Sequence, residues 1–427
     1  MILQSARFWT YEARSFATIA FVFFLALPSL ILADDVFVSP TGNDSNPGTL
    51  EQPLGTLFRA MSGLNAGDTL YVLPGVYRVA QQTNFVRRTN PQTFAFEPLV
   101  GSASATTRII GVRDDQGRMP RIYASLDVRG SYIEIFGLQL IGTDAGPLLS
   151  GIAVFDSHDI HISNCTISEF GGSGISFNQS DIVSATGNII FRNAFTNPNQ
   201  SSGISLYQNV VRTNSNARYG AVIRDNVCAL NENQVGPNSG GAITDGNGII
   251  IDDFLYTQQT GIIEQAIAGI QNDGATGVPV IEFDGSGNPL NYSRDTLVYN
   301  NITYFNGGRG IHVFLSDRVD IFRNLSFRNL TSPALTDGLP RDANGNPFFV
   351  YGEINLTDSQ DCRLINNLGL SLEGDVAGAA EQFFSRIPGD LQSNVFASRN
   401  SFFNIENPNL DVDVHNVQQS DLFSQAR

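Results

Sequence analysis

The sequence predicts an all-β solenoid, in which the chain winds into stacked coils of short strands. Glycine is abundant, with 41 in 427 residues, and asparagine is also frequent, so many turns are expected. From about residue 105 onward, segments of alternating apolar and polar residues recur with a spacing of roughly the low twenties or longer. Alternation places one side chain inside the coil and the next outside. A single coil cannot bury its apolar side chains alone, so the coils must stack.

The first 33 residues have the order of a secretory signal peptide. Arg7 and Arg14 precede an apolar run over residues 16–33, and acidic residues follow it. A small residue, Ala33, stands before the expected cleavage site. The run is near the lower length limit for a membrane span. We therefore expect export and cleavage, which leave a secreted or periplasmic chain with no membrane attachment.

Residues 34–77 predict a cap made of a strand, an amphipathic helix over about 54–64, and a second strand. A helix across the open end of a stack of coils covers unpaired backbone and apolar core. The segment resembles the N-terminal cap of secreted right-handed parallel β-helix proteins of the pectin-lyase-like superfamily, which includes family-9 polysaccharide lyases. The resemblance lies in these residues: Val38-Ser39-Pro40, Gly42, Asp44, Asn46-Pro47-Gly48-Thr49, Pro53, Thr56, Ala60, Gly67-Asp68-Thr69 and Gly75-Val76-Tyr77.

The resemblance implies one right-handed parallel β-helix domain over residues 34–427 that acts on carbohydrate. Two segments interrupt its repeats, at 254–294 and 333–350. Insertions in a solenoid form loops on one face, and we expect the first to border a binding cleft. Asparagines recur near the turns, where equivalent side chains can stack from coil to coil.

Alignment of three coils on the residue before each strand predicts which side chains share a surface. Ile249, Ile311 and Ile354 then form an inward column, and the residues after them face outward. These outward residues are Ile250, His312 and Asn355, with Asp252 two positions beyond Ile250. Because neighbouring coils lie about 4.8 Å apart, we expect the following residues to share one exposed sheet: Asp252, Arg309, His312 and Glu353.

Three aspartates near this sheet suggest a calcium site. Asp245, Asp252 and Asp253 supply hard oxygen ligands within a short stretch. Turn-forming aspartates are the alternative, because such residues are abundant in a solenoid. Calcium is therefore one expected cofactor.

Arg309 and His312 are the candidates for proton transfer. β-Elimination from a uronate requires neutralisation of its carboxylate and a base that removes the adjacent proton. The resembling family-9 lyases use a lysine base, but this chain contains no lysine, so that residue has no counterpart. Other β-helix lyases use arginine, whereas histidine is the easier base near neutral pH.

The remaining site predictions complete a catalytic and substrate-binding set. We expect Asp252 and Glu353 to assist Arg309 and His312 in catalysis. Substrate-binding side chains are expected at Asn247, Arg318 and Asn355.

A polysaccharide lyase acting on an acidic glycan is the favoured function, with two alternatives left open. A glycoside hydrolase would use two of the same carboxylates on either side of a glycosidic bond. A non-enzymatic protein would bind glycan through an outer face, for which Tyr207 and Phe314 are starting points.

Composition excludes some partners. The net charge of −16 lacks the basic footprint that nucleic acid requires. A polysaccharide is the expected partner, and the chain is expected to be a monomer. Cys165, Cys228 and Cys362 form no metal-binding pattern, and we expect them to be small buried residues.

Overall fold

The computed structural model describes residues 33–143, 146, 148–237, 243–258, 292–336, 352–357, 359, 361–371, 396–398 and 401–404. All of the predicted signal peptide except Ala33 lies outside these residues, as do most of the predicted insertions at 254–294 and 333–350. In the described part, no helix has both the length and the apolar character needed to cross a membrane.

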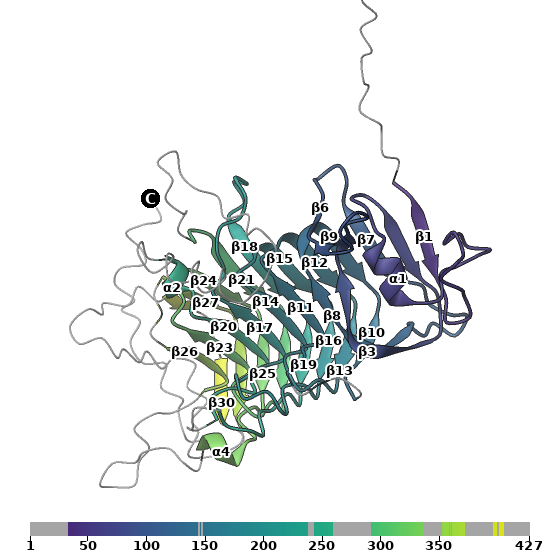
Figure 1. Ribbon diagram of the computed structural model, residues 1–427. Coiled ribbons are helices and arrows are strands. Elements are labelled where there is room, and N and C mark those ends of the chain that lie inside the picture. Colours follow the sequence, from purple (N-terminus) through teal and green to yellow (C-terminus); the bar gives the residue numbers. More distant parts are fainter. Residues whose placement is uncertain are drawn as a thin grey trace, which may run out of the picture. The chain divides into compact units, whose positions relative to one another are not determined.

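Residues 33–427 form one unit, in which two parallel sheets run along a stack of coils (Figure 1). The first sheet has the order β1(Asp35–Val38), β2(Thr69–Val72), β7(Thr107–Gly111), β9(Gly130–Phe136), β12(His158–Ser163), β15(Asp181–Thr186), β18(Tyr219–Arg224), β21(Asp295–Tyr299), β24(Val319–Phe322), β27(Arg363–Ile365) and β29(Phe396–Ser398), with β6(Leu99–Val100) beside β9.

The second sheet contains two strands from most coils. Its order is β26(Ile354–Thr357), β23(Ile311–Phe314), β20(Ile249–Asp252), β17(Ile204–Tyr207), β14(Ile175–Asn178), β11(Ile152–Phe155), β8(Arg121–Val128), β10(Gln139–Ile141), β13(Thr166–Ser168), β16(Ile189–Phe191), β19(Val227–Ala229), β22(Ile302–Tyr304), β25(Leu325–Phe327), β28(Leu368–Ser371) and β30(Ser401–Asn404), with β3(Val76–Val86) beside β8. A separate antiparallel pair joins β4(Arg88–Thr89) and β5(Phe96–Glu97). The predicted parallel β-helix is confirmed.

Helices are short and few in the described residues. They are α1(Leu57–Ser62), α2(Leu255–Gln258) and α4(Pro333–Thr336). The predicted capping helix is α1, although it is shorter than expected. Thr56 caps it, since its Oγ1 accepts a hydrogen bond from the Arg59 backbone N–H at 3.2 Å. Leu57, Ala60 and Met61 are buried below it, so α1 covers apolar core at the first coils.

Inward side chains form continuous apolar columns. Ile204, Ile249, Ile311 and Ile354 are paired from strand to strand and are fully buried. The predicted inward column is therefore confirmed. All three cysteines are buried and unpaired to each other, as expected.

A glycine precedes most strands of this column because the backbone there approaches the core. A Cβ atom on Gly248 would lie 2.6 Å from the Gly310 carbonyl oxygen and 2.9 Å from the Thr303 side chain. Such contacts do not occur between real atoms, so a side chain at this position must displace its surroundings. The same place before β26, the last described strand of this column, belongs to Glu353, whose location is described below.

Two buried asparagine ladders cross the turns and join the coils. In each, a side-chain oxygen accepts bonds from the backbone N–H and the side-chain amide of the preceding asparagine, and the amide nitrogen also donates to a backbone carbonyl. The first ladder consists of Asn188, Asn226, Asn301, Asn324 and Asn367, and the second of Asn193, Asn231, Asn306 and Asn329. The expected stacking of asparagines is confirmed.

Removal of one rung tests the ladder. In Asn301→Ala, both donors of Asn226 lose their acceptor, at 3.0 Å each, and the Ile223 carbonyl loses its donor. Because buried polar groups without partners are costly, we expect the free energy of unfolding to fall by about 3 kcal/mol. Urea denaturation measures it. Gln139→Ala, at an outward position of β10, is the control, with an expected change below about 0.5 kcal/mol.

Candidate functional site

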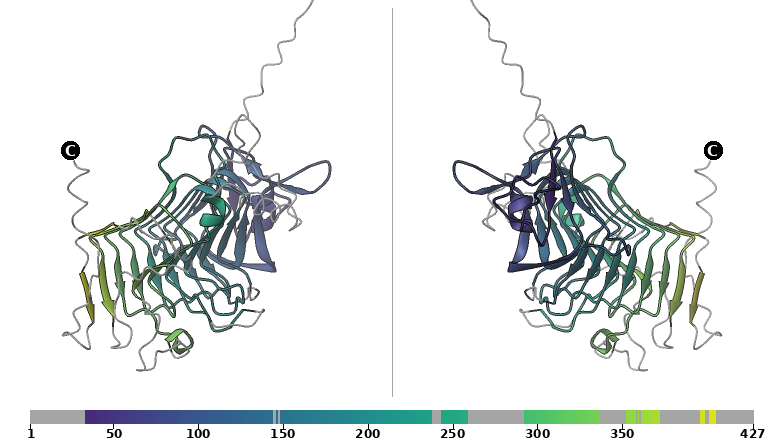
Figure 2. Two further views of the ribbon diagram at one scale, coloured as in Figure 1. Left: turned by 90° about the vertical axis from the view of Figure 1, so that its left-hand side faces the viewer. Right: turned by 90° about the vertical axis from the view of Figure 1, so that its right-hand side faces the viewer.

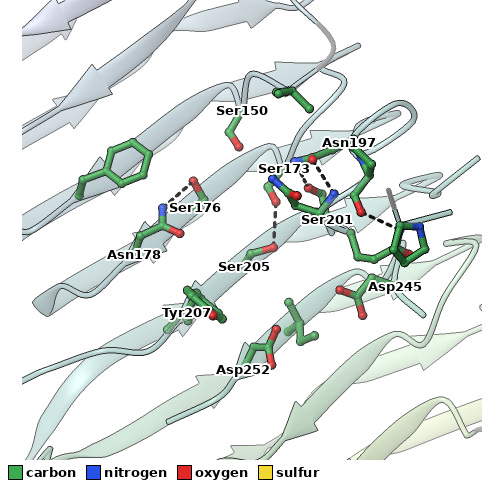
Figure 3. Close-up of a pocket in the computed structure, with 18 residues that line it drawn as sticks. Ser150, Ser173, Ser176, Asn178, Asn197, Ser201, Ser205, Tyr207, Asp245 and Asp252 are labelled. Carbon is green, nitrogen blue, oxygen red and sulfur yellow. Dashed lines mark hydrogen bonds between the residues drawn. The ribbon is translucent and has the colours of Figure 1, made fainter. Parts of the chain in front are cut away.

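An open groove of about 830 Å³ crosses the outer surface of β11, β14, β17 and β20. Two outward columns form its floor, and paired residues follow one another along each. The first runs through Ser176, Ser205 and Ile250, and the second through Phe155, Asn178, Tyr207 and Asp252. Figure 3 shows these small polar side chains along the strands, with Asp245 and Asp252 together at one end. The groove therefore has a neutral polar length and an acidic end.

Asp245 and Asp252 bring two carboxyl groups to this end. Burial raises the pKa of Asp245 to about 6, although Arg309 and a hydrogen bond from Asn247 oppose the rise. Burial and repulsion from Asp245 and Asp253 raise the pKa of Asp252 well above its usual value. Asp245 and Asp252 thus line the same end of the groove, and each is close enough to influence the other.

Asp253 also has a conformational role. Its backbone has a φ of 58°, which bends the chain at the end of β20. Gln208, at the equivalent position after β17, has a φ of 48°. Aspartate tolerates this left-handed region better than most residues. The turn conformation thus explains why an aspartate is accommodated at position 253.

Arg309 and His312 lie on the coil after Asp252. His312 pairs with Ile250, in the first outward column of the groove, and the expected register is therefore confirmed. Its Nε2 lies 3.3 Å from Thr357 Oγ1, and within the described structure Nδ1 has no hydrogen-bond partner. Arg309 donates from Nη1 to the Thr244 carbonyl at 2.5 Å.

The expected exposure of these two residues is wrong. Arg309 and His312 are 4% and 5% exposed. Burial, and secondarily the charge of Arg309, lowers the pKa of His312 well below its usual value. The imidazole is consequently neutral at neutral pH, and a neutral imidazole can accept a proton.

Of the three predicted substrate-binding residues, none lines the groove. Asn247 is fully buried, and its side chain accepts from the Arg309 N–H and donates to Ser202 and Asp245. Asn247 therefore holds Asp245 in position from the interior of the coil. Asn355 is buried beside His312, and its Oδ1 accepts from Thr357. Arg318, at a turn with φ of 61°, donates to the Tyr292 carbonyl.

Glu353 does not lie on the same sheet surface, which corrects its predicted position. Its carboxyl group points into the core and accepts bonds from Ser326 Oγ at 3.0 Å and from both donors of Asn329. The two ladders are five residues apart in each coil, but the fifth residue after Asn367 is Leu372. Glu353 supplies the acceptor that an asparagine at that position would provide. This location removes it from the proposed catalytic set.

Asp245 and Asp252 are the carboxylates of the groove that a metal ion could contact. Within the described ranges, no three His, Cys, Asp or Glu side chains form a group that could hold a metal. The donor chemistry nevertheless suits calcium, since hard oxygens that repel one another are stabilised by a cation. Asp245 and Asp252 would require further oxygen ligands from water or a bound molecule.

A family model for the Pel9A-like right-handed β-helix region matches residues 36–335. The chain belongs to this family. The resemblance seen in the cap is thereby confirmed, and the chain is a β-helix protein related to carbohydrate-active enzymes.

Individual relatives are more distant. Pectate lyase PEL9 of Emericella nidulans is 30% identical over 152 residues, which cover 34% of this chain and 35% of that protein. The chain thus matches about a third of the length of this curated relative. A rhamnogalacturonan lyase structure is 16% identical with a TM-score of 0.41, covering 86% of this chain and 88% of the other. Pectate lyase Pel9A is 13% identical with a TM-score of 0.38, covering 87% and 80%. These similarities between structures carry no information on activity.

Sequence reasoning missed most of the groove. Ser173, Ser176, Asn178 and Ser205 are small polar residues that look like ordinary strand exterior. The available signal was the pairing of Ser176 with Ser205 in one outward column and of Asn178 with Tyr207 in the column that leads to Asp252. Of the residues that line the groove, the sequence singles out Asp245 and Asp252 as candidate site residues and Tyr207 as a starting point for glycan binding.

The location of Glu353 predicts how stability depends on pH. Burial raises its pKa to about 7 from an ordinary value of 4.5. Its contribution to stability is therefore fully present below about pH 4.5 and is lost as pH rises through about 7. Each pKa unit corresponds to about 1.4 kcal/mol, so the loss is on the order of 3 kcal/mol.

Glu353→Gln should remove this dependence, because an amide stays neutral. We expect the melting temperature of the variant to fall less than that of the wild type between pH 4.5 and pH 8. Thermal unfolding followed by circular dichroism measures the difference. Parallel curves for the two proteins would contradict the assignment of the titration to Glu353.

Proposed function

We propose that this protein is a polysaccharide lyase that cleaves a uronate-containing glycan by β-elimination. The observation that carries the proposal is a buried neutral imidazole, His312, beside Arg309 and in line with a groove across four coils. Membership of the Pel9A-like family supports carbohydrate chemistry in general. The match to a pectate lyase supports elimination in particular.

In the proposed reaction, His312 removes the proton on the carbon next to the uronate carboxyl group. Its Nδ1 is buried in this structure, so the imidazole must become accessible to the substrate for this step. The electron pair of that C–H bond forms a carbon–carbon double bond. The bond to the glycosidic oxygen breaks, and the departing oxygen takes a proton from solvent. Arg309 stabilises the negative charge that develops on the carboxyl group.

Calcium is a further part of the proposal. Asp245, Asp252 and Asp253 would hold it, and it would supply positive charge to neutralise the uronate. The raised pKa values of Asp245 and Asp252 support this, because repulsion among carboxylates favours a bound cation.

His312→Gln tests the proposed base. We expect kcat/KM for the unsaturated product to fall by about 1,000-fold, since general-base catalysis contributes about 10²–10⁴. In the wild type, the lowered pKa of His312 should keep activity constant from pH 8 to 6.5 and reduce it only at lower pH. Ultraviolet absorbance of the new double bond is the measurement, with polygalacturonate and its methyl ester as substrates.

His161→Gln is the matched control for this variant. His161 is also a partly buried strand histidine whose pKa burial lowers, but it lies in β12 of the first sheet, bonded to Ser184 at 2.8 Å. The activity of the His161→Gln variant should stay within about twofold of that of the wild type. Full activity in His312→Gln would refute the assignment.

A glycoside hydrolase is the second candidate, favoured by the raised pKa of both groove carboxyl groups. One of Asp245 and Asp252 could remain protonated as an acid while the other is ionised. Reducing ends that rise without ultraviolet absorbance would establish hydrolysis. In that case Asp252→Asn would abolish activity, and His312→Gln would leave most of it.

Calcium binding has a readout that does not depend on activity. We expect added calcium to raise the melting temperature of the wild type by several degrees, because a ligand that binds the folded state stabilises it. Asp252→Asn should reduce this shift by at least half, whereas Asp225→Asn, a carboxylate on another turn, should keep it. Identical shifts in all three proteins would count against the aspartate site.

A further inference from the structure

The groove contains no basic side chain among the residues that line it, although it extends over four coils. Its polar lining consists of Ser, Asn, Gln and Tyr, with Asp245 and Asp252 as the ionisable carboxyl groups. The described chain at the acidic end has the same character, since residues 243–258 include no Arg, Lys or His and three acids. Positive charge is therefore absent from this length of the groove and from the sequence that adjoins its acidic end.

Two arginines near the ends of the groove are already engaged. Arg129 lies over the ring of Phe155, with its guanidinium carbon 4.6 Å from the ring centre, and pairs with Asp127 and Asp156 at 3.4 and 3.1 Å. Arg309 lies beyond Asp245 and donates to the Thr244 carbonyl. Neither guanidinium lines the groove itself.

A polymer with a free carboxylate on every sugar would place several negative charges on this surface. Buried or partly buried charges without partners are unfavourable, and like charges repel. Hydroxyl groups of uncharged sugars instead match the donors and acceptors of Ser173, Ser176 and Ser205. Tyr207, which is 38% exposed, offers an aromatic face against which a sugar ring can pack.

We propose that this groove binds a stretch of glycan whose sugars carry no free carboxylate, either neutral sugars or esterified uronates. The inference rests on the proposed function in one respect only, the position of the reacting sugar. That sugar would lie beyond the groove, near Arg309 and His312. The substrate would then be a mixed or esterified polymer rather than a fully charged polyuronate.

Affinity electrophoresis of the full chain tests the proposal by binding, without turnover. The probes are polygalacturonate, the same polymer highly methyl-esterified, and a neutral galactan, each with chelator present. We expect the esterified or the neutral polymer to bind at least tenfold more tightly than polygalacturonate. The preference between these two identifies the source of the uncharged sugars. Equal or tighter binding of polygalacturonate, or binding of none of the three, would overturn the proposal.

A charge placed in the groove gives a second, independent test. Asn178→Arg should strengthen polygalacturonate binding by about threefold at low salt, which corresponds to the worth of a surface ion pair. Thr186→Arg, at an outward position on β15 of the other sheet, is the matched control and should not change it. An equal gain from both variants would show that net charge, not the groove, decides the preference.

Binding and elimination can fail separately. A preference for uncharged polymers without unsaturated product from any of them would leave the groove inference in place and remove the lyase. Unsaturated product together with tight, chelator-insensitive binding of polygalacturonate would support the lyase and overturn the groove inference.

Discussion

Hydrogen bonding between equivalent asparagines in successive coils is the interaction on which the rest of the structure depends. Each buried rung satisfies the backbone and side-chain donors of the rung before it, so a coil cannot shift by one residue without leaving several donors unpaired. Strand pairing alone does not fix register so strictly, because a parallel ladder can slip. The strands of successive coils lie side by side along the stack (Figure 2). The asparagines set which residues of these adjacent strands face each other.

The candidate site is a direct consequence of that register. His312 lies beside Ile250 and Phe314 beside Asp252 because the coils are held in phase across a long intervening segment. The acidic end is likewise supported from the interior, where Asn247 bonds to Asp245 and to the backbone of Arg309. Residues that are distant in sequence thus reach one surface through core hydrogen bonds.

Much of this arrangement could be predicted from sequence, and the exceptions have physical causes. Alternation has a period of two, so the inward column through Ile249 and Ile311 and the outward place of His312 followed from alignment. The same alignment failed at Glu353, because it placed this residue on the exposed sheet, whereas the glycines at the equivalent positions, Gly248 and Gly310, mark a backbone close to the core. The burial of His312 was also unpredictable, since alternation gives the side of the strand on which a side chain lies and not its exposed fraction. The serines of the groove could not be singled out from sequence, because each one looks like an ordinary outward residue of a strand until strand pairing places them on one surface.

Burial shifts the titration of the site groups in opposite directions, and this bears on the missing lysine. A carboxyl group removed from water favours its protonated form, and an imidazole removed from water favours its unprotonated form. Asp245 and Asp252 are shifted upward and His312 downward, so the surroundings separate an acid from a base. Arginine keeps its proton in almost any environment, which makes Arg309 a source of fixed charge. In a chain without lysine, the neutral imidazole is then the group best suited to remove a proton, and the adjacent arginine reinforces that suitability by disfavouring the imidazolium.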